Sequence, residues 1–251
     1  MDTHKLYKDT ITLLFDSDKH FYSINNNKIP GTTSILQVIN KPALIPWAVG
    51  EACKYLQTIL IPGKSYDELE IKDMLDQAKW AHRRKKDTAA DIGVFVHQWC
   101  EDYITGKNPP MPINENIRNG VQAFLDWQKA NQVAFHLAEQ VVYSKEYNYA
   151  GTFDFTATLN GELMLGDFKT SSGIYDEMFF QTAAYQIARQ EEYPKEKYKA
   201  NVILRLGKDG EFESKVSYDF EKNKTAFLGA HALYTRLEEM KQEYFRNKNK
   251  E

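Results

Sequence analysis

The stretch GTFDFTATLNGELMLGDFKT, residues 151–170, determines the fold class of this chain. Its two arms, 151–159 and 162–170, are rich in β-branched and aromatic residues, and Asn160-Gly161 between them favours a two-residue type I′ turn. A hairpin of this kind makes the two strands antiparallel, so the sequence does not predict a doubly wound parallel sheet.

Segments on either side of this hairpin predict further strands and helices. We expect strands at 135–144, 199–206 and 211–218, and helices at about 88–105, 116–130 and 176–191. A long charged helix is expected from Asp219 onward. This order of elements predicts a mixed α/β (α+β) fold with a central mixed sheet flanked by helices.

The chain before this core is predicted to begin with a β-hairpin and then to be mainly helical. ITLLF (11–15) and HFYSI (20–24) are rich in β-forming residues and indicate the hairpin. We expect a single domain whose parts are an accessory region at 1–86, a core at 87–218 and a C-terminal helix at 219–251.

Helical patterning extends from about residue 46 to Arg84, with a break at Pro62-Gly63. The capping-box spacing of Ser65-Tyr66-Asp67-Glu68 predicts the start of a helix that runs to Arg84. Either Asp87 or Thr88 is expected to cap the helix that follows.

Composition and charge narrow the function classes. The chain has 32 Lys and Arg against 35 Asp and Glu, which gives a net charge of −3, and 42% of its residues are hydrophobic. This globular composition excludes a disordered protein, and the charge disfavours a surface that binds nucleic acid everywhere while allowing a local basic patch. Because the sequence shows no secretory signal and no apolar run of ~20 residues, we expect a soluble, cytoplasmic protein with no membrane partner.

Asp154 and Asp167 are placed symmetrically about the hairpin turn. Asp154 lies six residues before Asn160 and Asp167 six residues after Gly161, so a two-residue loop brings the two carboxylates near each other. Lys169 lies two residues beyond Asp167 and therefore on the same strand face. Burying this group is costly unless a divalent cation neutralises the carboxylates, and hard oxygen ligands suit Mg²⁺ or Mn²⁺. A solvated strand face is the alternative, because an isolated Asp-x-Lys pattern is a weak signal.

Other polar residues are spaced to join these carboxylates. His97 lies in an otherwise apolar helical stretch, where a lone histidine is more often a core residue, but here it could supply a nitrogen ligand. Cys100 one turn later would allow a zinc site, yet no second His/Cys pair has zinc spacing. Gln181 and Tyr185 are four apart and share a helix face, although such a tyrosine is more often a core aromatic. Hydroxyls that could contact phosphate follow the lysine, at Thr170, Ser171 and Ser172.

Four short motifs occur in a fixed order, namely G-x-x-x-H (93–97), GTFD (151–154), GDFKT (166–170) and Q-x-x-x-Y (181–185). In this order and at these separations they resemble the RecB-like branch of the PD-(D/E)xK nucleases. The resemblance covers about residues 88–206. It extends more loosely to KIPGTTSIL (28–36) and Trp47, which look like the opening of phage-type exonucleases and of mitochondrial genome maintenance exonucleases.

The resemblance implies a restriction-endonuclease-like core that holds one or two Mg²⁺ or Mn²⁺ ions. Lys169 would position the attacking water and help to deprotonate it, while Gln181 and Tyr185 would orient the DNA strand. Glu139 is the candidate for the acidic residue that the family often has on its first core strand. The iron–sulfur cluster of several relatives needs four cysteines and is excluded here, because the chain has two. The implied metal ligands are His97, Asp154, Asp167 and the backbone carbonyl of Phe168.

The activity implied by the resemblance is metal-dependent hydrolysis of DNA phosphodiester bonds. We expect an exonuclease that acts on single-stranded or end-bearing DNA in phage-type replication, recombination or repair, in a bacterial or phage-infected cytoplasm. One alternative is a structure-specific or flap endonuclease with the same site. Another is a non-catalytic nucleic-acid-binding module on a nuclease scaffold.

A basic segment precedes the helix that bears His97. Residues 79–86 carry five positive charges and no acidic residue. A solvated helix end would explain such a cluster, because basic residues are favoured at helix C-termini. Its position directly before the helix that bears His97 favours contact with DNA phosphates instead, with neighbouring aromatic residues available to stack on bases. The expected DNA-binding residues of this segment are Arg83, Arg84, Lys85 and Lys86.

Overall fold

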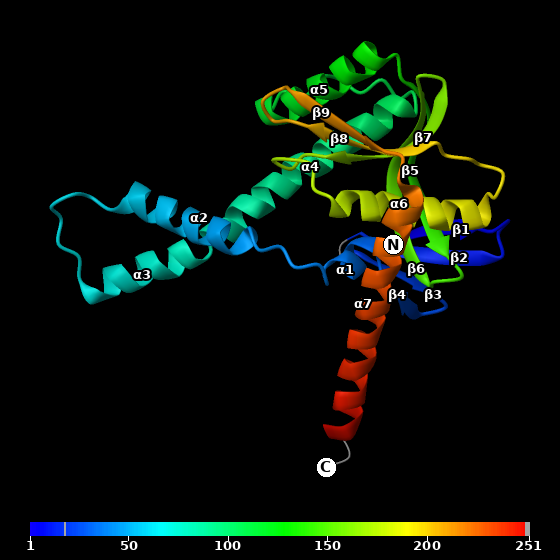
Figure 1. The fold of residues 1–251 in the computed structure, drawn as a ribbon. Coiled ribbons are helices and arrows are strands. Elements are labelled where there is room, and N and C mark those ends of the chain that lie inside the picture. Colours follow the sequence, from blue (N-terminus) through cyan, green and yellow to red (C-terminus); the bar gives the residue numbers. More distant parts are fainter. Residues whose placement is uncertain (18, 249–251) are drawn as a thin grey trace. The chain divides into compact units, whose positions relative to one another are not determined.

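A computed structural model describes residues 1–17 and 19–248 of the chain (Figure 1). The described chain divides into two compact units. The first comprises Met1–Ile39 together with the chain from Val96 onward, and the second comprises Asn40–Phe95.

The first unit begins with an antiparallel sheet in which β1 (Asp2–Leu6), β2 (Ile11–Asp16), β3 (Phe21–Ile24) and β4 (Asn27–Ile29) follow in chain order. The predicted pairing of the second and third strands is confirmed. The first and last strands were not predicted from the sequence. β1 is polar, with only Leu6 buried, and β4 is three residues long, so neither has the apolar alternation that marks a strand.

The central sheet has the strand order β5-β6-β7-β8-β9, with β7 and β8 parallel and the other neighbours antiparallel. The predicted mixed α/β fold with a mixed sheet is therefore confirmed. Leu159 pairs with Glu162 across the turn, and Asn160 and Gly161 have φ angles of 52° and 80°, as a type I′ turn requires. The strands are β5 (Ala134–Ser144), β6 (Tyr149–Leu159), β7 (Glu162–Lys169), β8 (Ala200–Leu206) and β9 (Phe212–Ser217).

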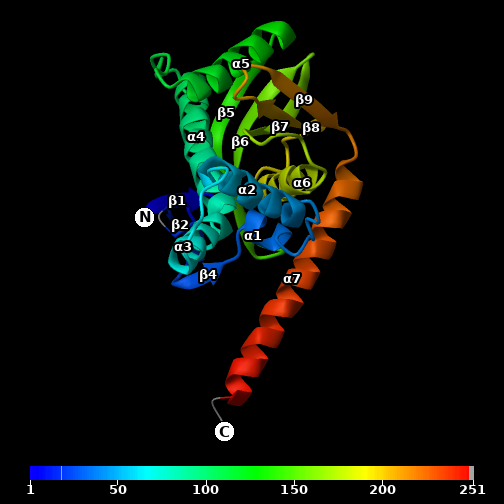
Figure 2. The same ribbon diagram turned by 90° about the vertical axis from the view of Figure 1, so that its left-hand side faces the viewer.

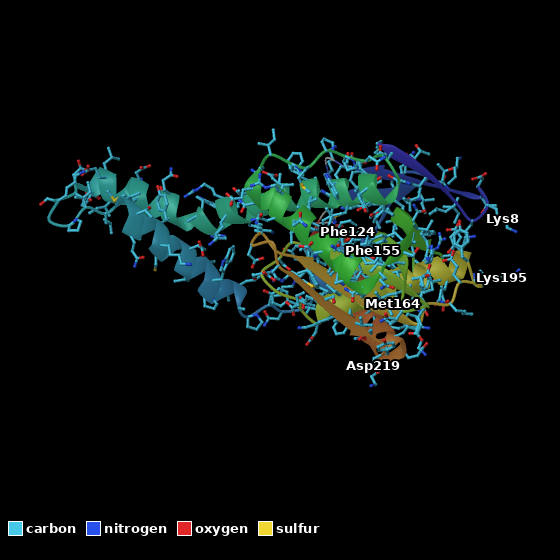
Figure 3. The ribbon with its side chains drawn as sticks, turned by 90° about the horizontal axis from the view of Figure 1, so that it is seen from above. Lys8, Phe124, Phe155, Met164, Lys195 and Asp219 are labelled. Atoms are coloured by element: carbon cyan, nitrogen blue, oxygen red, sulfur yellow. The ribbon has the colours of Figure 1, made fainter. Side chains whose placement is uncertain are left out.

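Helices flank this sheet, as predicted. Figures 1 and 2 show α5 (Glu115–Asn131) and α6 (Glu177–Glu192) on opposite sides of it. The α5 side is an aromatic core. The ring of Phe124 lies 5.6 Å from that of Phe168, and the ring of Trp127 lies 6.0 Å from that of Phe155, measured between centroids. Figure 3 shows Phe124 and Phe155 in the interior of this unit.

The short helix α1 (Thr32–Leu36) and the long helix α7 (Phe220–Lys248) complete the first unit. α7 packs against α6 and α1, where Phe227 is fully buried and its ring lies 4.9 Å from that of Tyr149. The rest of this helix is mostly solvent-exposed, in keeping with its charged sequence.

The second unit contains α2 (Leu44–Ile59), α3 (Glu68–Lys79) and the part of α4 (Ala81–Ile104) up to Phe95, with α2 and α3 packed side by side. The predicted break at Pro62-Gly63 falls between α2 and α3. Among the described residues, no helix combines the length and the apolar character that a membrane span needs.

Three predicted helix boundaries in this unit are wrong. The capping box is Asp67 with Glu70, because each side chain accepts the other residue's backbone N–H at 2.8 and 3.0 Å, so α3 begins two residues later than a cap at Ser65 would set it. The helix also ends at Lys79 rather than at Arg84, and α4 begins at Ala81 without a cap at Asp87 or Thr88. The segment after Trp80 has no glycine or proline, so nothing in it delays the start of α4.

Candidate functional site

The β6–β7 hairpin brings Asp154 and Asp167 together. The ladder runs from the turn to the pair Phe155–Gly166, and Asp154 and Asp167 are the next residues along each strand. The Asp154 Oδ2 accepts the backbone N–H of Phe168 at 2.5 Å, which fixes this carboxylate against the end of β7. Both carboxylates are buried, with residue exposures of 7% and 2%.

Gly166 makes this register possible. A Cβ at this position would lie 2.1 Å from Cζ of Phe155, whose ring stacks on Phe168 with centroids 4.6 Å apart. Any side chain would displace the phenylalanine and with it the strand that carries Asp167. The glycine of the GDFKT motif is therefore a packing requirement of the site.

His97 and Glu139 approach Asp154 from two other elements. His97 projects from α4, and its Nδ1 lies 3.3 Å from Oδ1 of Asp154. Glu139 lies on β5 between Ala138 and Gln140, which pair with Phe155 and Phe153, so it stands opposite Asp154 in the ladder. Its φ of 44° is rare for a non-glycine residue inside a strand and is of the kind found at functional sites.

One potential ligand atom each from His97, Glu139 and Asp154 lies within 4.8 Å of the other two. We call these residues the ligand cluster. One imidazole nitrogen and two carboxylates form a donor set that suits a hard divalent cation such as Mg²⁺ or Mn²⁺. The residues present therefore fit the kind of ion expected from the sequence.

The electrostatics of the ligand cluster favour a cation. Burial and the neighbouring charge of Asp154 raise the pKa of Glu139 to about 9, so the metal-free cluster holds a proton on this side chain at neutral pH. Burial alone would also raise the pKa of Asp154, but the charge and hydrogen bond of His97, with help from Lys169, hold it below its usual value. A divalent ion would replace the extra proton and remove the repulsion between the carboxylates.

Asp167 and Lys169 form a second, adjoining pair. The Nζ of Lys169 makes an ion pair with Oδ2 of Asp167, and Asp167 is not part of the ligand cluster. Burial raises the pKa of Asp167 to about 6 despite this partner. For Lys169, burial would lower the pKa, but the charges of Asp167 and Asp154 outweigh it and keep the ammonium charged.

A polar chain continues from this pair into α6. The Nζ of Lys169 donates to Oε1 of Gln181 at 3.2 Å, and Nε2 of Gln181 donates to the hydroxyl of Tyr185 at 2.5 Å. The ring of Tyr185 passes so close to Gly151 that a Cβ there would lie 2.5 Å from its Cε1. The first glycine of the GTFD motif therefore makes room for the tyrosine of the last motif.

These groups line one cavity of about 550 Å³ in the first unit. Residues that the sequence analysis did not assign complete it, among them Phe15, His20 and Tyr22 of the N-terminal sheet. None of the motifs contains them, and in the sequence they indicated only the strands of the predicted hairpin. Of the residues expected from the sequence, those in the cavity are His97, Glu139, Asp154, Asp167, Lys169, Gln181 and Tyr185.

Other expected residues do not line this cavity. Phe168 contributes its backbone N–H to Asp154, while its ring belongs to the aromatic core. The Ser171 hydroxyl donates to the carbonyl of Gly173 at 2.8 Å, and the Ser172 hydroxyl lies 3.1 Å from that of Tyr175, so both are engaged locally. Thr170 precedes them and is likewise outside the residues that line the cavity. Cys100 is buried, and burial raises the pKa of its thiol, which does not favour the zinc alternative.

The basic segment lies in the second unit and spans the end of α3 and the start of α4, so it is not a helix C-terminus. Lys85 pairs with the buried Glu51 at 2.9 Å. The guanidinium of Arg84 lies 5.2 Å from the ring centre of Tyr55, and that of Arg83 lies 5.8 Å from the ring centre of Trp80. These cations and aromatic rings form a mixed basic and aromatic surface within that unit.

No protein-family model matches the chain, and no curated protein is similar to it in sequence at a significant level. Among solved structures, the crystal structure of SSO0001 is similar, with 10% identity and a TM-score of 0.33. The similarity covers 76% of this chain and 86% of that one. A likeness of this strength indicates neither a shared fold nor a shared function.

Proposed function

We propose that this protein is a metal-dependent deoxyribonuclease that hydrolyses phosphodiester bonds and acts as an exonuclease on single-stranded or end-bearing DNA. The observation that carries the proposal is the ligand cluster of His97, Glu139 and Asp154, which shares one cavity with the Asp167–Lys169 pair. The ordered motifs that resemble RecB-like PD-(D/E)xK nucleases, which contain four of these residues, also support it.

In this proposal, His97, Glu139 and Asp154 hold the ion, and Asp167 lies beside them as a further carboxylate. A bound Mg²⁺ or Mn²⁺ supplies Lewis acidity, which activates water and stabilises charge on the scissile phosphate. The protein's own part is to place charge and donors around the reacting phosphate.

Lys169 provides the positive charge that this chemistry needs. Its ammonium stays protonated, because Asp167 and Asp154 hold its pKa above the usual value, and its side chain is mostly buried in the cavity. A fixed cation in such a site stabilises the negative charge that develops on the phosphate oxygens. Gln181 accepts from Lys169 and donates to Tyr185, so it fixes the direction of the ammonium group.

The basic segment is proposed to bind the DNA backbone. Trp80 is 47% exposed and lies beside the cations of Lys79 and Arg83, so one surface offers both phosphate contacts and a ring for base stacking. Phosphate contacts of this kind are independent of sequence and sensitive to salt.

The test compares wild type with Lys169→Ala on labelled linear and closed circular single strands, with Mn²⁺, Mg²⁺ or EDTA. We expect wild type to degrade the linear strand only with metal, and Lys169→Ala to be nearly inactive while it still binds metal and DNA. Lys222→Ala is the matched control, because Lys222 is exposed and forms an ion pair with Asp219 at the start of α7.

Each other outcome has a defined meaning. Cleavage of the circular strand would replace the exonuclease by an endonuclease with the same site. Retention of DNA without any metal-dependent cleavage would favour the non-catalytic binding module. A fully active Lys169→Ala enzyme would show that the catalytic residues are assigned wrongly.

A further inference from the structure

The N-terminal sheet contributes an aromatic wall to the cavity that holds the ligand cluster. Phe15 on β2, His20 before β3 and Tyr22 on β3 line the same cavity as Asp154 and Lys169. We call these three residues the aromatic wall. The hydrolytic chemistry proposed above uses none of them.

The aromatic wall is held at a fixed place beside the carboxylates. The rings of Phe15 and Tyr22 have centroids 4.7 Å apart, and those of Phe15 and His20 are 5.9 Å apart. The hydroxyl of Tyr22 lies 3.0 Å from Oγ1 of Thr152, in hydrogen-bonding contact, and Thr152 is two residues before Asp154 on β6. Tyr22 is therefore hydrogen-bonded to β6, the strand that carries Asp154, and Phe15 connects its ring to that of His20.

His20 is not explained by packing. Phe15 and Tyr22 belong to the hydrophobic cluster of the N-terminal sheet, whereas His20 is exposed and its ring packs edge-on against that of Phe15. Thr33 and Gln37 line the same cavity, and within the described chain their side chains form no hydrogen bond. An open ring face with unengaged polar groups nearby suits a nucleobase, which offers a π-face for stacking and a polar edge for hydrogen bonds.

The size of the cavity selects the form of the substrate. A volume of about 550 Å³ lies within the range of sites that enclose one small organic ligand, roughly 300–1,000 Å³. A single nucleotide is of this size. Duplex DNA is too wide to enter it, because its major groove alone is about 12 Å wide.

We infer that the aromatic wall is a stacking subsite for one unpaired base next to the phosphate at the ligand cluster. The inference rests on the proposed nuclease function and specifies its substrate class as a single-stranded or frayed DNA end. A base stacked on His20 would register the strand, so that the adjacent phosphate lies at His97, Glu139 and Asp154.

The test combines protein variants with a modified strand. His20→Ala removes the exposed ring, His20→Phe keeps a ring without imidazole nitrogens, and His136→Ala removes an exposed histidine that contacts Thr158 and does not line the cavity. Linear single strands carry one abasic nucleotide at successive positions from the cleaved end. We expect His20→Ala to raise KM roughly tenfold with little change in kcat, within the range of about 5- to 150-fold that loss of one stacked base produces.

The pattern across variants identifies stacking. His20→Phe should restore KM, and His136→Ala should match wild type. One abasic position should raise the wild-type KM by about as much as His20→Ala does, and should have no further effect in that variant. Equal cleavage of a blunt duplex and a single strand would overturn the substrate class.

Failure of the subsite is distinguishable from failure of the nuclease function. A wild type that cleaves the intact strand but responds neither to the abasic nucleotide nor to the His20 substitutions would overturn the subsite alone. If wild type cleaves nothing, the nuclease function fails, and a strand with 2-aminopurine near its end still tests the subsite. Fluorescence quenching that is lost in His20→Ala would support stacking, and quenching unchanged in that variant would overturn it.

Discussion

Replacing Glu139 with glutamine tests the electrostatics of the ligand cluster directly. In the metal-free protein, burial and the charge of Asp154 raise the pKa of Glu139 from 4.5 to about 9. Between these two values the folded state keeps a proton on Glu139 that the unfolded state releases. The folded state therefore binds more protons, and this side chain makes stability fall as pH rises from about 4.5 to about 9. Glutamine has a similar shape, carries no titrating proton and can still donate to Asp154.

The size of the effect follows from one proton. Unfolding that releases one proton lowers the free energy of unfolding by roughly 1.4 kcal/mol per pH unit. Between pH 6 and pH 8, wild type should therefore lose ~3 kcal/mol relative to Glu139→Gln. The comparison between the two proteins cancels the contributions of Asp167 and His97 to first order.

Urea unfolding in EDTA at pH 6, 7 and 8, followed by tryptophan fluorescence, measures this difference. Glu162→Gln is the matched control, because Glu162 lies at the start of β7 with its side chain 41% exposed and outside the cavity. We expect its difference from wild type to be independent of pH. Adding Mn²⁺ should abolish most of the pH dependence of wild type, because the ion takes the place of the proton. A difference between wild type and Glu139→Gln that is the same at pH 6 and pH 8 would show that Glu139 is not held protonated.

Three further predictions concern the metal, the hairpin and the basic segment. Asp154→Asn should abolish the rise in melting temperature that Mn²⁺ produces in wild type, as measured by scanning calorimetry with and without the ion. The control Asp102→Asn, which removes an exposed ion pair with Lys107, should keep that rise. Gly166→Ala should destabilise the protein by about 1–3 kcal/mol in urea unfolding, because its Cβ would overlap the ring of Phe155, while Gly229→Ala in α7 meets no atom within 4 Å and should be neutral or stabilising. Neutralising Arg83, Arg84, Lys85 and Lys86 should weaken binding to single-stranded DNA. The slope of log K against log salt should fall by up to about 3, because each lost phosphate contact removes ~0.7. An unchanged slope would show that this segment is a solvated surface that does not contact DNA.

The sequence predicted the hairpin and its carboxylates well because local chemistry controls both. Asn160 and Gly161 accept the positive φ angles that a type I′ turn needs, and a two-residue turn sets the register of everything beyond it. Counting residues from the turn was therefore enough to bring Asp154 and Asp167 together. The same logic holds for Gln181 and Tyr185, whose spacing on a helix sets their shared face.

Parts of the site that depend on distant contacts could not be predicted in this way. Glu139 reaches Asp154 through the pairing of β5 with β6 and through a φ of 44°, which a glutamate in a strand does not signal. The aromatic wall depends on how the N-terminal sheet packs, in a contact between Tyr22 and Thr152 that are 130 positions apart. The early start of α4 was missed because acidic and hydroxyl residues at 87–88 look like a cap although the helix already runs through them.

The placement of charge in this fold is itself an argument for a ligand. Asp154 and Asp167 are buried in a sheet whose other face is an aromatic core, and His97, Glu139 and Lys169 converge on them. Buried ion pairs seldom add to stability, and apolar residues of the same volume often serve the fold better. Glycines at 151 and 166 are also needed to let Tyr185 and Phe155 pack around these groups. An arrangement that costs folding free energy and constrains its neighbours is accounted for when a cation and a phosphate complete it.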